Sequence, residues 1–248
     1  MSREPARFEH RGRVLLVFEQ GRRTGPTFVL VHGIGVASRY FRRLAPLLAE
    51  QGRVLTVELP GFGQAPRPRR VQRVEDHGDL LAAYLASIGC RDAVLVGHSM
   101  GTQIVVDAAL KHPVGALTLI GPVTDPDARS ALRQGLRLLL DMLREPPASN
   151  WIVLTDYARC GPSWYLRTLP SMLGYDLERR LPQVTVPATV VRGSRDPIAR
   201  ARWAGRVAEL LPASRLVEVA GAPHVAMFSH PERVAAEILG GVRSAEVP

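Results

Sequence analysis

The pentapeptide Gly97-His98-Ser99-Met100-Gly101 is the strongest chemical signal in the chain. It follows the apolar run Ala93–Val96 and precedes a stretch with helical periodicity. A serine between two glycines at a strand–turn–helix junction is typical of a nucleophile held on a sharp turn, where larger neighbours would crowd the backbone. We predict that Ser99 is a catalytic nucleophile. The alternative is a serine that only shapes the turn.

A serine hydroxyl needs a base to become a good nucleophile. With this motif the partners follow in the order Ser, then Asp or Glu, then His. Beyond Ser99, His112 comes too early, which leaves His224 and His230. His224 lies in a loop directly after the last apolar run, whereas His230 precedes Pro231 and fits the start of a helix. We therefore predict that His224 is the base.

The third member should be a carboxylate that orients the imidazole and stabilises its charged form. Asp196 follows the apolar run Ala188–Val191 in a turn at the end of a predicted strand, and we predict that it is the acid. Asp125 and Asp127 are rivals because they follow the preceding run, but their Thr-Asp-Pro-Asp context equally fits a turn and a helix cap.

Acyl transfer also needs backbone N–H groups to hold an oxyanion. The Met100 N–H is one predicted donor, because it lies at a helix start where amides lack partners. The loop Val31–Gly35 contains glycines that can turn amides toward a site, so we predict Ile34 as the second donor, with Gly35 as the alternative.

No cofactor or metal is predicted. The fingerprint G-x-G-x-x-G and the Gly-Lys-Ser/Thr sequence of phosphate loops do not occur. The two cysteines, Cys90 and Cys160, have neither the spacing of a zinc site nor the number needed for a disulfide framework, and they favour free thiols in a reducing cytoplasm.

The elements that must position these residues alternate along the chain. Short β-branched runs with little polar alternation predict strands buried on both faces of a parallel sheet. These runs are Val14–Phe18, Thr27–Val31, Arg53–Val57, Ala93–Val96, Ala116–Ile120, Ala188–Val191 and Leu216–Val219. Helices are predicted between them at Tyr40–Glu50, Val74–Ile88, Thr102–Lys111, Ala199–Leu211 and Pro231–Leu239. The pattern predicts an α/β fold with a doubly wound, mostly parallel sheet flanked by helices.

One segment interrupts this alternation. Residues 122–186 show no convincing strand, so we expect a helical lid inserted into a core made of residues 1–121 and 187–248. Asp127–Leu143 predicts an amphipathic helix with Leu132, Leu136, Leu139 and Leu143 on one face. Shorter helices are expected around Trp151–Arg159 and Ser163–Leu173.

Aromatic residues are frequent in this insertion. We predict that Trp151, Tyr157, Trp164 and Tyr165 bind substrate in an apolar or aromatic pocket, the alternative being that they pack the lid onto the core. Three arginines that recur every four residues either meet an anionic substrate or form a solvated helix flank. They are Arg129, Arg133 and Arg137.

Composition adds few constraints. The 248 residues are 46% hydrophobic and 22% charged, as in ordinary globular proteins, and carry a formal charge of +9. Lys111 is the only lysine among 32 basic residues, and the excess is spread along the chain. This indicates a compositional bias rather than a nucleic-acid surface, and no nucleic-acid partner is predicted. No membrane span or signal peptide is expected, so the predicted location is the cytoplasm.

Together these motifs resemble the α/β-hydrolase fold family over almost the whole chain. The matching segments are His32–Gly35, Pro60–Gly63, the serine pentapeptide, Gly193–Asp196 and His224, while Glu58 stands where similar enzymes often have Asp. The resemblance implies a cofactor-free serine hydrolase with a lid between its sixth and seventh strands.

We expect hydrolysis of a small, apolar or aromatic carboxylic ester through an acyl-enzyme. A lactonase, a carbon–carbon bond (diketone) hydrolase, a thioesterase and a cofactor-free perhydrolase would share the same triad and remain alternatives. A non-catalytic ligand-binding protein on the same fold is the alternative of another class. Oligomeric state is not predicted.

Overall fold

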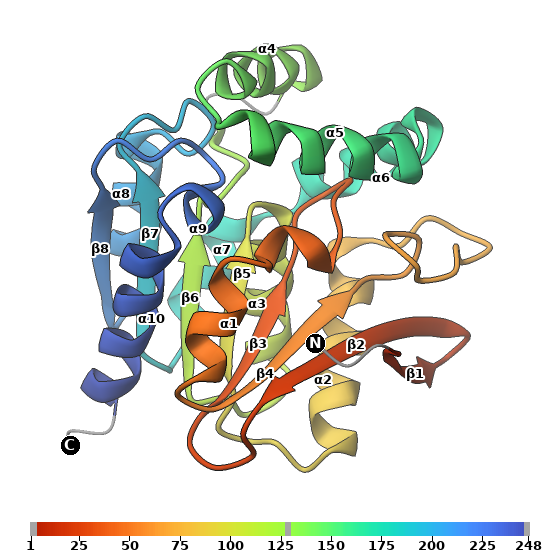
Figure 1. Cartoon of the computed structure of the whole chain (residues 1–248), viewed down its shortest axis with the longest axis vertical. Coiled ribbons are helices and arrows are strands. Elements are labelled where there is room, and N and C mark those ends of the chain that lie inside the picture. The colour runs from red at the N-terminus through yellow and green to blue at the C-terminus, as the bar shows by residue number, and fades with distance from the viewer. Residues whose placement is uncertain (1–3, 127–129, 246–248) are drawn as a thin grey trace.

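The computed structural model describes residues 4–126 and 130–245 and is built around one eight-stranded sheet (Figure 1). The strand order is β1-β2-β4-β3-β5-β6-β7-β8, with β1 and β2 antiparallel to their neighbours and the others parallel. The strands are β1 Ala6–His10, β2 Arg13–Gly21, β3 Thr27–Val31, β4 Arg53–Glu58, β5 Val94–His98, β6 Ala116–Ile120, β7 Ala188–Gly193 and β8 Ser214–Val219. The predicted doubly wound, mostly parallel fold is confirmed.

Helices cover both faces of the sheet because its central strands are apolar on both sides. On β3, Val29 and Val31 pack into the core under α2 Val74–Ser87, α3 Met100–Ala109 and α8 Ala201–Leu210. The alternate residues Phe28 and Leu30 pack into the other core, under α1 Leu44–Ala49 and α10 Pro231–Ala245. The period of two thus sends successive side chains to opposite layers.

All seven predicted strands are present, but β1 was not predicted from the sequence. It is an edge strand with exposed and half-buried residues, so it lacks the apolar run used to find the others. Its pairing with β2 is set by a tight turn in which Arg11 and Gly12 both have positive φ, as a two-residue hairpin of type I′ requires.

Predicted helices differ from the observed ones mainly at their ends. The stretch predicted as one helix at Tyr40–Glu50 is divided between the short 3-10 helix η1 Ser38–Phe41 and α1. The final helix, α10, extends beyond Leu239 to Ala245. A one-turn helix, α9 Ala226–Ser229, precedes α10.

In the described residues between β6 and β7, the regular elements are helices. They include α4 Ala131–Met142, α5 Pro147–Cys160, α6 Pro162–Gly174, α7 Leu177–Arg180 and the 3-10 helix η3 Leu181–Gln183. We call residues 122–186 the inserted segment. Figure 1 shows α4, α5 and α6 beyond the end of the sheet toward which the parallel strands point. These helices therefore lie at the edge where α/β proteins bind ligands.

The leucine face of α4 does not pack against the core. Leu132 is 75% exposed, Leu136 55%, Leu139 57% and Leu143 79%. A different stripe of the same helix faces inward, and it includes Leu138 and Asp141. Helical periodicity identified the helix, but it did not identify which face meets the protein.

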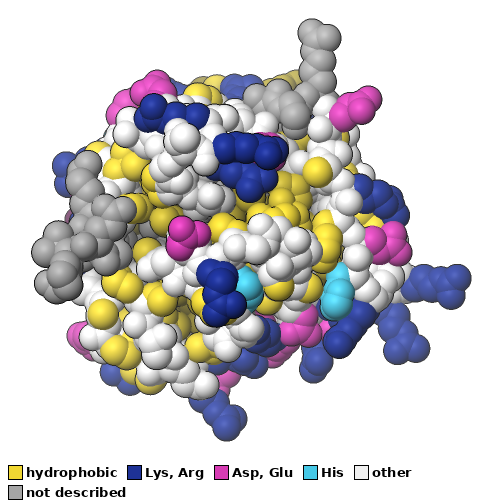
Figure 2. Space-filling view, turned by 90° about the horizontal axis from the view of Figure 1, so that it is seen from below, with side chains coloured by type: hydrophobic (Ala, Val, Ile, Leu, Met, Phe, Trp, Pro, Cys, Tyr) yellow, Lys and Arg dark blue, Asp and Glu magenta, His cyan; other side chains and the backbone are white. Residues whose placement is uncertain are grey.

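Basic residues are dispersed, and many form ion pairs. Lys and Arg side chains lie among acidic and apolar ones on the face shown in Figure 2. Arg53 pairs with Glu19 at 2.9 Å, and Arg180 pairs with Asp107 at 2.9 Å. Within the described residues, no helix has the length and apolar character required to cross a bilayer.

Candidate active site

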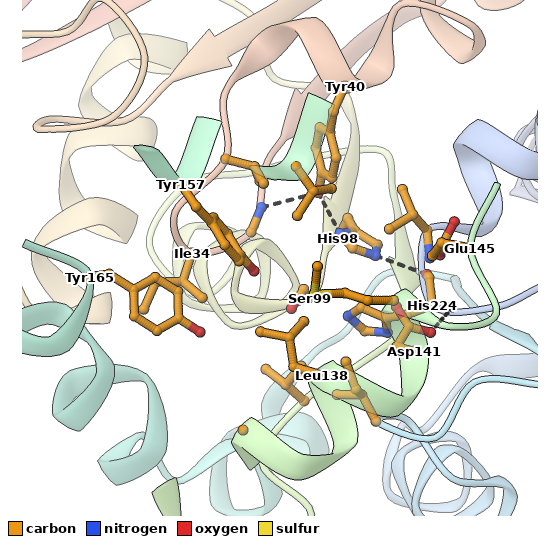
Figure 3. Close-up of a pocket in the computed structure, with 18 of the residues that line it drawn as sticks. Ile34, Tyr40, His98, Ser99, Leu138, Asp141, Glu145, Tyr157, Tyr165 and His224 are labelled. Carbon is orange, nitrogen blue, oxygen red and sulfur yellow. Dashed lines mark hydrogen bonds between the residues drawn. The ribbon is translucent and has the colours of Figure 1, made fainter. Parts of the chain in front are cut away.

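A cavity of about 240 Å³ lies between the carboxyl ends of the parallel strands and the inserted segment (Figure 3). Its walls come from both parts of the chain. Core residues that line it include Gly33, Ile34, Tyr40, His98, Ser99, Ile198 and His224, and inserted residues include Leu138, Asp141, Met142, Glu145, Tyr157, Tyr165, Leu169 and Met172. The lining is mainly apolar, with a few convergent polar groups.

Ser99 lies at this cavity on a strained turn between β5 and α3. Its φ of 55° and ψ of −121° are unusual for a residue with a side chain. The flanking glycines are sterically required: a Cβ at Gly97 would lie 2.4 Å from the Gly101 carbonyl oxygen, and a Cβ at Gly101 would lie 2.2 Å from that of Val31. The backbone therefore fixes the direction of the Ser99 Cα–Cβ bond.

Asp196 and His224 form a buried hydrogen-bonded pair beside Ser99. The Asp196 Oδ2 atom lies 2.8 Å from His224 Nδ1, and its Oδ1 atom accepts from the N–H groups of Ile198 (2.7 Å) and Ala199 (2.9 Å). An ionised carboxylate only accepts, so Nδ1 carries the proton and Nε2 is left for other partners. Ser99 and His224 both line the cavity, and Figure 3 labels them there.

The charges around His224 oppose the effect of its burial. Burial alone would lower the pKa of His224, but the Asp196 carboxylate, together with Asp141 and Glu145, raises it to about 9. Burial likewise tends to raise the pKa of Asp196, yet His224 and the two backbone donors bring it below its usual value. The pair is thus arranged to stabilise an imidazolium next to a carboxylate.

A buried hydrogen-bonded chain links the Ser99 turn to two loops. The Gly33 N–H donates to the Tyr40 hydroxyl at 3.2 Å, and that hydroxyl contacts His98 Nδ1. His98 Nε2 lies 3.0 Å from the His224 carbonyl oxygen, which can only accept, so Nε2 is the protonated nitrogen and Nδ1 accepts from Tyr40. Burial lowers the pKa of His98, which keeps this ring neutral.

The predicted oxyanion donors lie at the same edge of the sheet. Met100 is the first residue of α3, so its N–H precedes the helical hydrogen bonds. Gly33 is engaged by Tyr40, which leaves the next amides, Ile34 and Gly35, as candidates. Gly35 has a φ of 79°, and a Cβ there would lie 2.6 Å from the Tyr157 ring.

The four aromatic residues predicted to bind substrate lie in different places. Tyr157 and Tyr165 line the cavity with ring centroids 5.2 Å apart. Trp151 is 70% exposed and does not line the cavity. Trp164 packs on the Pro60–Gly63 loop, where a Cβ at Gly61 would lie 2.5 Å from its ring.

Two carboxylates of the inserted segment contact the loop that carries His224. The His224 N–H donates to Asp141 Oδ1 at 2.9 Å, and the Val225 N–H donates to Glu145 Oε1 at 2.7 Å. Burial raises the pKa of Asp141 to about 6 and that of Glu145 to about 7. Sequence reasoning missed both residues. The signal available was an acidic pair four residues apart near the end of a leucine-rich helix.

The rival residues lie elsewhere. Asp125 is 3.2 Å from Arg200 and 3.6 Å from Arg137, and His230 stands at the start of α10 beside Ser229. Arg133 and Arg137 do not line the cavity. Asp127 and Arg129 lie outside the described residues.

Among the residues that the structure describes, no group of three His, Cys, Asp or Glu side chains is placed to hold a metal ion.

Most of the chain matches a known family. The model of the Alpha/beta hydrolase family matches residues 28–237. The chain belongs to this family. The resemblance predicted from the motifs is therefore confirmed.

A sequence relative indicates that the chain is an enzyme. A pimeloyl-[acyl-carrier protein] methyl ester esterase of Aromatoleum aromaticum is 30% identical over 255 residues, which covers 88% of this chain and 98% of the relative. With the family match, this identifies the chain as a hydrolase of the carboxylesterase-like type.

Solved structures share the fold. A thermophilic esterase from Thermogutta terrifontis superposes with a TM-score of 0.82 at 22% identity, covering 98% of each chain. An enol-lactonase from Burkholderia xenovorans LB400 superposes with a TM-score of 0.80 at 21% identity, covering 96% of this chain and 100% of that one. At these identities the likeness concerns the α/β-hydrolase fold alone.

Proposed function

We propose that this α/β hydrolase cleaves a small carboxylic ester through Ser99, His224 and Asp196. The observation that carries the proposal is that His224, which Asp196 bonds at 2.8 Å, lines the same cavity as a serine held at positive φ. A buried acid–base pair next to a strained serine is the arrangement that serine hydrolases use.

The reaction follows from the tautomer of His224. His224 Nε2 accepts the proton of Ser99 as Oγ attacks the ester carbonyl carbon, while Asp196 stabilises the resulting imidazolium. The negative oxygen of the tetrahedral intermediate accepts hydrogen bonds from Met100 and Ile34. The C–O bond then breaks, and the alcohol leaves with the proton from His224. Water attacks the acyl-enzyme by the same route, releasing the acid and returning the proton to Ser99.

The inserted segment, residues 122–186, is proposed as the lid over a core made of residues 1–121 and 187–248. Its support is that α4, α5 and α6 provide about half of the cavity wall and lie across the strand ends. Excluding water from this cavity would strengthen the electrostatic interactions of the triad.

The cavity also limits the substrate. Its volume of about 240 Å³ lies just below the usual range of ligand sites, so a short acyl group is favoured. Tyr157 and Tyr165 are proposed to contact it, whereas Trp151 and Trp164 are not. No arginine lines the cavity among the described residues, and two carboxylates do, which disfavours an anionic acyl group. The methyl ester hydrolysed by the relative makes a methyl ester a useful test compound.

Activity of Ser99→Ala tests the proposal. We expect the wild type to hydrolyse p-nitrophenyl butyrate and the variant to lose at least ~10⁴-fold in kcat. Ser87→Ala, at the exposed end of α2, is the control and should retain full activity. A fluorophosphonate probe should label the wild type and not Ser99→Ala. Hydrolysis by Ser99→Ala at the wild-type rate would refute the nucleophile.

A panel on the same two proteins decides the substrate class. It should contain methyl esters, lactones, thioesters and ring-opened diketones, with perhydrolysis tested by adding peroxide. Preferred turnover of any class other than an ester would replace the proposed reaction while keeping the triad.

A further inference from the structure

The loop that carries His224 is held from three directions. Asp196 bonds the ring, His98 of β5 bonds the carbonyl oxygen at 3.0 Å, and Asp141 of the inserted segment bonds the N–H at 2.9 Å. The next amide, Val225 N–H, is held by Glu145. Two of these four bonds therefore come from residues of the inserted segment.

Both carboxylates are deeply buried. Asp141 is 2% exposed and Glu145 is 7% exposed, and both line the cavity (Figure 3). The Ser149 side chain lies beside the Glu145 carboxyl and lowers its pKa, but burial has the larger effect and raises the pKa overall. A burial of this kind is costly, and a neutral acceptor could satisfy the two N–H groups at lower cost. Packing alone thus does not explain why carboxylates stand there.

We propose that Asp141 and Glu145 are positioning residues for His224, so that the triad is complete only while the inserted segment is docked on the His224 loop. This proposal rests on the proposed function, because it concerns the same base. It makes the inserted segment a part of the catalytic apparatus in addition to a cover.

The same contacts place negative charge behind the imidazole. The titratable groups that face His224 are Asp196 from the loop after β7, His98 from β5, and Asp141 and Glu145 from the inserted segment. The positive charge of Arg144 lowers the pKa of Asp141. Asp141 and Glu145 raise the pKa of His224, so removing either charge should lower it.

A second attachment provides an internal comparison. Asp156 of α5 accepts from the Ala37 N–H at 3.1 Å and pairs with Arg39 at 2.6 Å. Like Asp141, it is a buried carboxylate of the inserted segment bonded to a core amide, 3% exposed. It does not line the cavity, so its loss should weaken docking without changing the field at His224.

The experiment compares Asp141→Asn, Asp141→Ala, Glu145→Gln and Asp156→Asn with the wild type. For each protein, kcat and KM for p-nitrophenyl butyrate are measured from about pH 6 to about pH 10. The pKa of His224 is measured independently by ¹⁵N-histidine NMR, which needs no turnover. Glu178→Gln, a surface residue of α7 paired with Arg206, is the activity control.

Each variant has a distinct expected result. Asp141→Asn keeps an acceptor for the His224 N–H but removes the charge, so the pKa of His224 should fall by about one unit with kcat within about threefold at high pH. Asp141→Ala leaves a buried N–H unpaired and should lower kcat about 10- to 100-fold with little change in KM. Glu145→Gln should shift the pKa in the same direction, whereas Asp156→Asn should not shift it.

The outcomes separate this proposal from the proposed function. Wild-type kcat in Asp141→Ala, or an unchanged His224 titration in both Asp141→Asn and Glu145→Gln, would overturn the positioning role even if ester hydrolysis is established. Losses of kcat that merely follow lower thermal stability, with no titration shift, would overturn it as well. If no ester is hydrolysed but the titration shifts as expected, the proposed function fails and the structural coupling stands.

Discussion

Replacing Ser99 by glycine should stabilise the protein relative to replacing it by alanine. Both variants lack the hydroxyl, so they differ only in a Cβ at one backbone position. That position has a φ of 55° and a ψ of −121°, which disfavours any residue with a Cβ. Alanine retains this strain, and glycine releases it.

The size of the effect follows from two opposing terms. A non-glycine residue in such a region costs about 1–3 kcal/mol. Glycine, in turn, gives the unfolded chain more conformational freedom, which lowers the free energy of unfolding by about 0.5–1 kcal/mol relative to alanine. The net gain in the free energy of unfolding is about 1 kcal/mol, which raises Tm by about 2–4 °C for a chain of this size.

Thermal and urea unfolding, followed by circular dichroism, measure this difference. The matched control is the same pair of substitutions at Ser87, the last residue of α2, which has no positive φ. There, glycine should be the less stable of the two, because glycine disfavours helices. A Ser99→Gly protein no more stable than Ser99→Ala would refute the view that the turn is strained.

Two further predictions concern activity. The wild-type kcat/KM for ester hydrolysis should rise with pH from neutrality toward about 9. The reason is that His224 acts as a base only after it loses its proton, and nearby carboxylates raise its pKa to about 9. A flat profile between about pH 6 and 9 would contradict this charge arrangement. Tyr40→Phe should lower stability by about 1–3 kcal/mol and also lower kcat, because it leaves the buried Gly33 N–H and His98 Nδ1 unpaired. Tyr84→Phe on α2 is its control, and equal effects of the two changes would count against the hydrogen-bonded chain.

Local patterns predicted most of the core. Runs such as Thr27–Val31 identify buried strands because a parallel sheet covered on both faces needs apolar side chains at every position. The serine pentapeptide identifies its own turn because its two glycines are sterically required there. The order of Asp196 and His224 after Ser99 and their places after strands predict them as its partners, and the parallel topology brings the ends of those strands to one edge.

What the sequence determined by itself was therefore the alternation of strands and helices, the Ser99 turn and the candidates for its partners. These features depend on periodicity and local sterics, which are set by residues close together in the sequence. The orientation of the inserted segment was decided only in three dimensions. The leucine stripe of α4 is exposed, and the stripe that contains Asp141 faces the site. Which stripe faces inward depends on a backbone amide of the His224 loop, more than 80 residues away in sequence. The links from Tyr40 to His98 and from Asp141 to His224 are likewise long-range, since hydrogen bonds between separate elements leave no periodic trace in the chain.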